Sequence, residues 1–184
     1  MRFTFLIFLF LAVFFMSGKK VESTLSEQEK ADLISEHNIW RAEVKVEDIQ
    51  WSDELASEAQ KWANYLAKKG CHMRHSRSKY GENIYWSTYE STPKEVVDSW
   101  ASEKKYYHGG KIKQSKVYKY GHYTQVVWHN TKFVGCGRAK CKNGDEIWVC
   151  NYSPTGNYLG ETGQNHTFEK PDCLKVCLKQ LCNT

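Results

Sequence analysis

The spacing of apolar residues changes part-way along the chain, and this change limits the folds that the chain can adopt. From Leu33 onward, apolar side chains recur three or four residues apart, as on one face of an α-helix. Beyond Gly121, short runs alternate every two residues, as strands do. Helices followed by strands favour an α+β domain with helices layered on an antiparallel sheet.

Three helices are predicted in the first part of the chain. Ser26 and Glu29 form a capping-box pattern at the start of the first helix. A second helix is predicted over 52–69, and a third begins at Thr92 with Pro93 in its first position. The apolar stripe of the first helix holds Leu33, His37, Trp40 and Val44. The inner face of the third is predicted to hold Val96, Val97, Trp100 and, one turn further, Glu103.

Three strands are predicted after the helices. They cover 123–128, 133–139 and 146–152, and a turn around Asn143 and Gly144 joins the last two. His122 falls on the same two-residue alternation as the inward side chains of the first run, Thr124, Val126 and Trp128. The helical and strand patterns therefore place two polar side chains, those of Glu103 and His122, among buried apolar residues.

The N-terminus resembles a secretory signal. Arg2 precedes an apolar run from Phe5 to Met16, which is shorter than the about 20 residues that a membrane-spanning helix needs. We expect cleavage after Ser23, with a cut after Gly18 or an uncleaved anchor as alternatives. No other run is apolar enough to span a membrane, so we expect an extracellular protein.

Charge argues against nucleic acid as a partner. The chain has a net charge of +5 and no block of five or six like charges. Binding to nucleic acid or to a membrane surface through charge is therefore not indicated.

All seven cysteines lie beyond the N-terminal apolar run, and no CxxC pair is present. In an exported chain this predicts disulfides and argues against a zinc-finger site. Asn165 is a predicted N-glycosylation site in a polar segment, whereas Asn151 is in a predicted strand and is expected to be buried and unmodified.

Four motifs together resemble the CAP superfamily of cysteine-rich secretory, antigen 5 and pathogenesis-related proteins, including the SCP/TAPS venom-allergen-like type. They are HNIWR at 37–41, GENIY at 81–85, GHYTQVVWHNT at 121–131 and IWVCNYSPTGNY at 147–158. Trp148 is bulkier than the residue usual at its position in the family. The resemblance implies a three-layer α-β-α sandwich with a small antiparallel sheet. We expect a signal peptide at 1–23, a CAP domain at 24–160 and a short cysteine-containing tail at 161–184.

The resemblance also implies a cleft lined by His75, Glu82, Glu103 and His122. Residue chemistry is compatible with this, because buried charges must be paired or must bind a metal. Two imidazoles and two carboxylates can ligate a divalent ion, and the nitrogen ligands favour zinc. The alternative is that the four groups only satisfy one another and tie the helices to the sheet. No cofactor is required on either interpretation.

The family pattern implies two disulfides, Cys71 with Cys141 and Cys136 with Cys150. Cys173, Cys177 and Cys182 lie outside the matched region, and their pairing stays open.

The resemblance further implies binding of a sterol or fatty acid. The candidate ligand loop runs from 106 to 120, and Gly109 and Gly110 favour its mobility. Its aromatic residues are Tyr106, Tyr107, Tyr118 and Tyr120. The alternative for each tyrosine is that it closes over the core.

No catalytic activity is predicted. Spacing identifies no nucleophile with an adjacent base, and HExxH is absent. Two other hypotheses remain: a secreted effector that acts on a receptor protein, and a metal-dependent hydrolase. His37 and Asn38 are expected to be core and capping residues of the first helix.

Overall fold

The computed structural model describes residues 25–164. The predicted signal segment, Asn165 and the three tail cysteines lie outside the described residues. The helices are α1 (Glu27–Glu43), α2 (Asp53–Lys68), α3 (Pro93–Ala101), a 3₁₀ helix η1 (Ser102–Tyr106) and α4 (Val117–Val126). The strands are β1 (Gln50–Trp51), β2 (Gly81–Ser87), β3 (Phe133–Lys140) and β4 (Glu146–Ser153).

The four strands form one sheet in the order β1-β3-β4-β2. β3 pairs with β4 and β4 with β2 in antiparallel fashion, whereas the two-residue β1 runs parallel to β3. Along β4, Trp148 and Cys150 belong to one apolar cluster, and Ile147 and Val149 belong to the other. Because successive strand residues face opposite ways, this alternation requires a helical layer on each face of the sheet.

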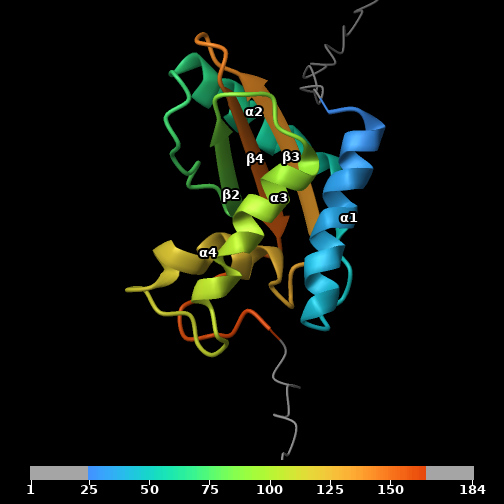
Figure 1. Ribbon diagram of the computed structural model, residues 1–184, viewed down its shortest axis with the longest axis vertical. Coiled ribbons are helices and arrows are strands. Elements are labelled where there is room, and N and C mark those ends of the chain that lie inside the picture. Colours follow the sequence, from blue (N-terminus) through green and yellow to red (C-terminus); the bar gives the residue numbers. More distant parts are fainter. Residues whose placement is uncertain (1–24, 165–184) are drawn as a thin grey trace, which may run out of the picture.

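The helices form two layers with the sheet between them (Figure 1). α2 covers one face, where it contacts β3 and β4, and α1, α3 and α4 lie on the other. α2 approaches β3 so closely that a Cβ on Gly135 would lie 2.2 Å from the backbone nitrogen of Ala56. The predicted three-layer α-β-α fold is confirmed, and its sheet is mixed only because of β1.

The prediction of a strand over 123–128 is wrong, because α4 occupies residues 117–126. The last four residues of this helix, 123–126, are all buried, so the predicted stretch shows no polar face with a helical period, although Tyr118 and Lys119 near the start of the helix are exposed. Glu103 does not extend α3 as predicted. The α-helix ends at Ala101, and Glu103 lies in η1.

Arg41 joins α1 to the segment that follows α4. Its guanidinium is fully buried and donates hydrogen bonds to the carbonyls of Val126 and Trp128 at 3.0 Å and of Thr131 at 2.9 Å, while Nε donates to Glu47 at 2.7 Å. This arrangement fixes the C-terminal end of α4. Within residues 25–164, none of the helices is long and apolar enough to span a bilayer.

Candidate functional site

His122 is held by Glu103 at the junction of α4 and η1. Glu103 Oε1 lies 2.8 Å from His122 Nδ1, and Glu103 Oε2 accepts the backbone N–H of His122 at 2.9 Å and that of Tyr123 at 3.3 Å. A carboxylate only accepts hydrogen bonds, so the imidazole carries its proton on Nδ1. In a neutral ring the free electron pair is then on Nε2.

His75 forms a matching pair with Glu82 at the start of β2. Glu82 Oε1 lies 2.7 Å from His75 Nδ1 and accepts the backbone N–H of Ser76 at 2.9 Å. This hydrogen bond raises the pKa of His75 above its ordinary value. The Glu82 side chain is 5% exposed, whereas that of His75 is 65% exposed. The acid is therefore a fixed support, and the imidazole faces solvent.

The segment that carries His75 has no helix or strand and is held by its neighbours. The Cys71–Cys141 disulfide fixes its start. Trp62 Nε1 donates to the carbonyl of Arg74 at 2.9 Å, and the Arg74 guanidinium lies 5.8 Å from the centroid of the Trp62 ring system. These contacts with α2 place the His75 backbone beside the sheet.

Both histidines line an open cavity of about 420 Å³, which we call the cleft. Its apolar wall consists of Met73, Ile84, Tyr85, Trp86 and Trp100. The polar groups His75, Glu103 and His122 line it as well. The volume falls in the range of small-molecule sites, about 300–1,000 Å³. The cleft therefore combines an apolar wall with two imidazoles.

A smaller side pocket of about 210 Å³ shares His75 and His122 with the cleft and adds Glu82, Asn83 and Tyr118. Within the described part of the chain, Glu82 Oε2 is buried without a hydrogen-bond partner. A buried carboxylate oxygen without a partner is costly, and a bound cation or a ligand donor would satisfy it.

The four predicted residues thus form two His–Glu pairs that meet at shared cavities. No three His, Cys, Asp or Glu side chains of residues 25–164 are grouped closely enough to hold a metal ion. In each pair the glutamate lies on the Nδ1 side of its histidine. Metal-bound imidazoles generally donate their other N–H to a carboxylate in this way.

The candidate loop divides into buried and exposed tyrosines. Tyr107 and Tyr120 are buried with ring centroids 5.1 Å apart, so these two close over the core. Tyr107 Oη donates to the carbonyl of Gly110 at 2.6 Å, which ties the glycine pair down. Tyr106 is exposed, and Tyr118 is 73% exposed at the side pocket.

His37 has the core role predicted for it, whereas Asn38 does not cap α1, whose caps are Ser26 and Val44. His37 is fully buried, and its Nδ1 lies 2.7 Å from the carbonyl of Leu33. Asn38 accepts the backbone N–H of Ile49 at 2.8 Å, which fixes the segment after α1. Asn151 is buried in β4, as predicted.

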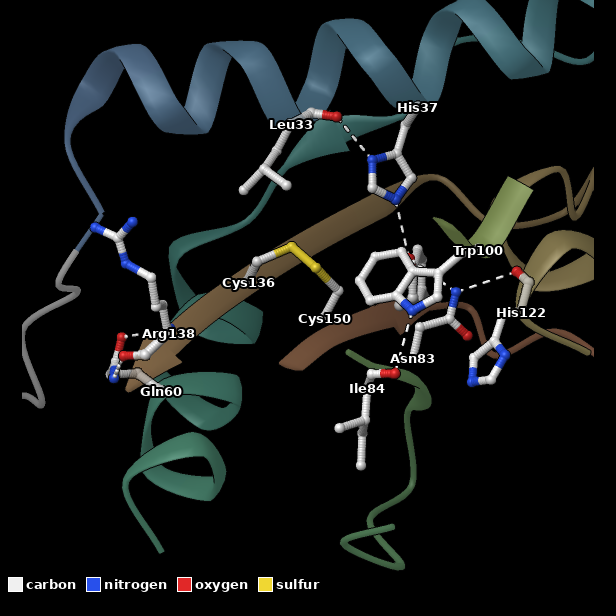
Figure 2. Close-up of a disulfide and its surroundings, with 11 residues drawn as sticks. Leu33, His37, Gln60, Asn83, Ile84, Trp100, His122, Cys136, Arg138 and Cys150 are labelled. Atoms are coloured by element: carbon white, nitrogen blue, oxygen red, sulfur yellow. Dashed lines mark hydrogen bonds between the residues drawn. A yellow bond between two sulfur atoms is a disulfide. The ribbon is translucent and has the colours of Figure 1, made fainter. Parts of the chain in front are cut away.

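The structure contains the two disulfides that the resemblance implies, Cys71–Cys141 and Cys136–Cys150. The second links β3 to β4 beneath α1 (Figure 2). Disulfides persist in oxidising compartments, so both fit an extracellular protein.

The sequence matches the family model of CAP, the cysteine-rich secretory protein family, over residues 34–152. The chain belongs to the CAP family. Pathogenesis-related protein 1C of Nicotiana tabacum is 40% identical over 138 residues, which cover 74% of this chain and 82% of the relative.

Solved structures have the same fold. BmVAL-1 is 28% identical and superposes with a TM-score of 0.62 over 80% of this chain and 86% of its own. NaASP2, solved with Zn²⁺, is 23% identical with a TM-score of 0.67 over 76% of this chain and 86% of its own. Because NaASP2 is only 23% identical, its similarity to this chain concerns the fold alone.

Sequence reasoning did not identify the apolar wall of the cleft or the amide of Asn83. The GENIY motif contains Asn83, Ile84 and Tyr85, but no strand was predicted there. Met73 and Trp86 are isolated exposed apolar residues, and no sequence periodicity marks them.

Proposed function

We propose that this CAP protein is exported and binds a small apolar ligand, a sterol or a fatty acid, in the cleft. One observation carries the proposal: an apolar wall and two imidazoles line the same 420 Å³ cavity. Apolar pockets with a few fixed polar groups are typical small-molecule sites. The ligand's apolar body lies along Trp86 and Met73, and its hydroxyl or carboxylate faces His75 and His122.

A divalent cation, zinc in the first instance, is the second ligand that we propose for the polar end of the cleft. The support is that each Nδ1 is engaged by a carboxylate, so each Nε2 can donate its electron pair to the ion. Imidazole nitrogen is a preferred zinc ligand. Binding at this end requires no chemical step, and we assign the protein no catalytic activity.

Retention of radiolabelled cholesterol or palmitate by the secreted protein tests the apolar ligand. Trp86 is 41% exposed on the cleft wall, and Phe133 is 43% exposed outside it. We expect Trp86→Ala to lower retention about tenfold, since an aromatic contact of this size contributes about 1–3 kcal/mol. Phe133→Ala is the matched control and keeps wild-type retention.

Wild-type retention no higher than that of a glycosylation-matched control protein refutes the apolar ligand. An equal loss in both variants refutes its placement in the cleft. N-terminal sequencing of the same secreted sample tests the predicted cleavage after Ser23.

A further inference from the structure

A line of buried polar groups connects helix α1 to His122 beneath the cleft. His37 and Tyr152 are fully buried, and Asn83 is 1% exposed. Asn83 Nδ2 lies 3.1 Å from the carbonyl oxygen of His122 and 3.3 Å from Tyr152 Oη, which lies 2.9 Å from His37 Nε2. Figure 2 shows the amide of Asn83 directed at His122, with His37 above it on α1.

The direction of every hydrogen bond in this line is fixed. Burial lowers the pKa of His37 to about 4, so the ring is neutral near pH 7. Its Nδ1 faces the carbonyl of Leu33 and must donate, which leaves Nε2 as an acceptor for the hydroxyl of Tyr152. The phenol oxygen then accepts one amide hydrogen of Asn83, and the other goes to His122.

The line completes a three-point hold on His122. Glu103 binds the ring Nδ1 and the backbone N–H, while Asn83 binds the carbonyl. A buried polar group left without its partner costs about 1–3 kcal/mol, so each member keeps the next in place. The backbone of α4 is thereby fixed at the residue whose imidazole lines the cleft.

Strand β2 connects the contacts that hold His122 to those that hold His75. Glu82, which pairs with His75, directly precedes Asn83 in the strand. The next residue is fixed as well, because Trp100 Nε1 donates to the carbonyl of Ile84 at 3.2 Å. Two adjacent strand residues therefore place both imidazoles.

We infer that Asn83, Tyr152 and His37 are positioning residues for His122: they hold its backbone so that its Nδ1–H stays on Glu103. Asn83 lines the 210 Å³ side pocket, whereas Tyr152 and His37 line neither that pocket nor the cleft. The inference rests on the proposed function, because it concerns the cation end of that site. It extends the site from the two His–Glu pairs to the buried core.

Tautomer measurement by NMR on metal-free, ¹⁵N-histidine-labelled protein tests this inference. Long-range ¹H–¹⁵N spectra report which nitrogen of His122 carries the proton. Tyr152→Phe removes the hydroxyl but keeps the packed ring, and Asn83→Ala removes the amide. The control is Gln60→Met, because Gln60 is fully buried and donates to the carbonyl of Arg138 at 2.7 Å in the α2 layer.

We expect the Nδ1–H form of His122 to predominate in the wild type and in Gln60→Met, and to be lost in part in Tyr152→Phe and Asn83→Ala. Wild-type spectra in both test variants, or an equal change in Gln60→Met at matched stability, overturn the inference. A change in Asn83→Ala alone overturns the roles of Tyr152 and His37.

Zinc titration of the same samples separates this inference from the proposed function. We expect about tenfold weaker zinc binding in Tyr152→Phe, at the lower end of losses on removal of outer-shell partners. If the wild type binds no zinc, the proposed cation site is refuted, and the tautomer spectra still decide whether the three residues position His122.

Discussion

Glu103 holds His122 with both carboxylate oxygens, one on the ring Nδ1 at 2.8 Å and one on the backbone N–H at 2.9 Å. Ring orientation and helix position are therefore set by a single acid. Glu82 holds the His75 segment in a similar way but with one oxygen. Its Oε1 accepts hydrogen bonds from the His75 ring and from the backbone N–H of Ser76. Two segments far apart in the sequence thus present imidazoles to one cleft in the same manner.

Glu103→Gln is expected to weaken zinc binding about 10–100-fold, as loss of an outer-shell partner does. A glutamine has only one acceptor oxygen. When that oxygen takes the backbone N–H of His122, the amide NH₂ faces Nδ1 and moves the ring proton to Nε2. Isothermal titration calorimetry measures the change. Glu43→Gln is the control, because Glu43 pairs with Lys104 outside the cleft, and equal affinities in the two variants would contradict the assignment.

His37 is expected to destabilise the protein in acid. Its pKa is lowered from 6.5 to about 4, so between these values the unfolded chain binds a proton that the folded chain does not. The stabilisation is fully present above pH 6.5 and is lost as the pH falls toward 4, a change of about 3 kcal/mol. Urea unfolding of wild type and His37→Gln across pH 4–7 tests this. Parallel stability curves would show that His37 does not titrate as described.

His75 is expected to make zinc binding and stability respond to pH in opposite directions. Its raised pKa means that the His75–Glu82 pair stabilises the fold below about pH 6.5 and that this contribution is lost as the pH rises through the raised value. Zinc, in contrast, needs the neutral ring and binds better as the pH rises.

Glu82→Gln should therefore move the midpoint of the zinc-binding pH profile to lower pH. His72→Ala, which removes an exposed histidine of the same segment, serves as the control and leaves the midpoint unchanged. An unchanged midpoint in Glu82→Gln would exclude the carboxylate as the cause.

The double variant Cys71→Ala/Cys141→Ala should cost about 4 kcal/mol of unfolding free energy, because this disulfide closes a loop of 70 residues. Zinc binding should weaken as well, since the bond fixes the start of the His75 segment. Cys136→Ala/Cys150→Ala, which opens a loop of 14 residues, should lower stability with less effect on zinc. Equal zinc affinity in the two double variants would argue against a role for the first disulfide in placing His75.

The sequence predicted the helices with clear caps and one apolar face, and it missed β2 and α4, whose last four residues are all buried. Ser26 and Thr92 cap α1 and α3 as their patterns indicated. Residues 123–128 alternate like a strand, yet 123–126 lie in α4, where Asn157 donates to the carbonyl of Gly121 and Glu103 accepts the N–H groups of His122 and Tyr123. These partners are distant in sequence, so no local pattern predicts them.

For the candidate site, the family resemblance implied His75, Glu82, Glu103 and His122, and the structure pairs them two by two. The pairing itself was not predictable, since it depends on how η1 and β2 approach α4. Asn83 and Tyr152 are polar or aromatic residues of ordinary strands, and only the three-dimensional contact with His37 and His122 shows their connection.

Zinc titration of the wild type, His75→Ala, His122→Ala and the double variant by calorimetry at pH 7.5 tests the central claim most directly. If the two imidazoles share one ion, the wild type binds one zinc per chain, each single variant loses about 100-fold or more in affinity, and the double variant loses little beyond that. Wild-type affinity in either single variant, or no zinc binding by the wild type, would contradict a shared cation site at His75 and His122.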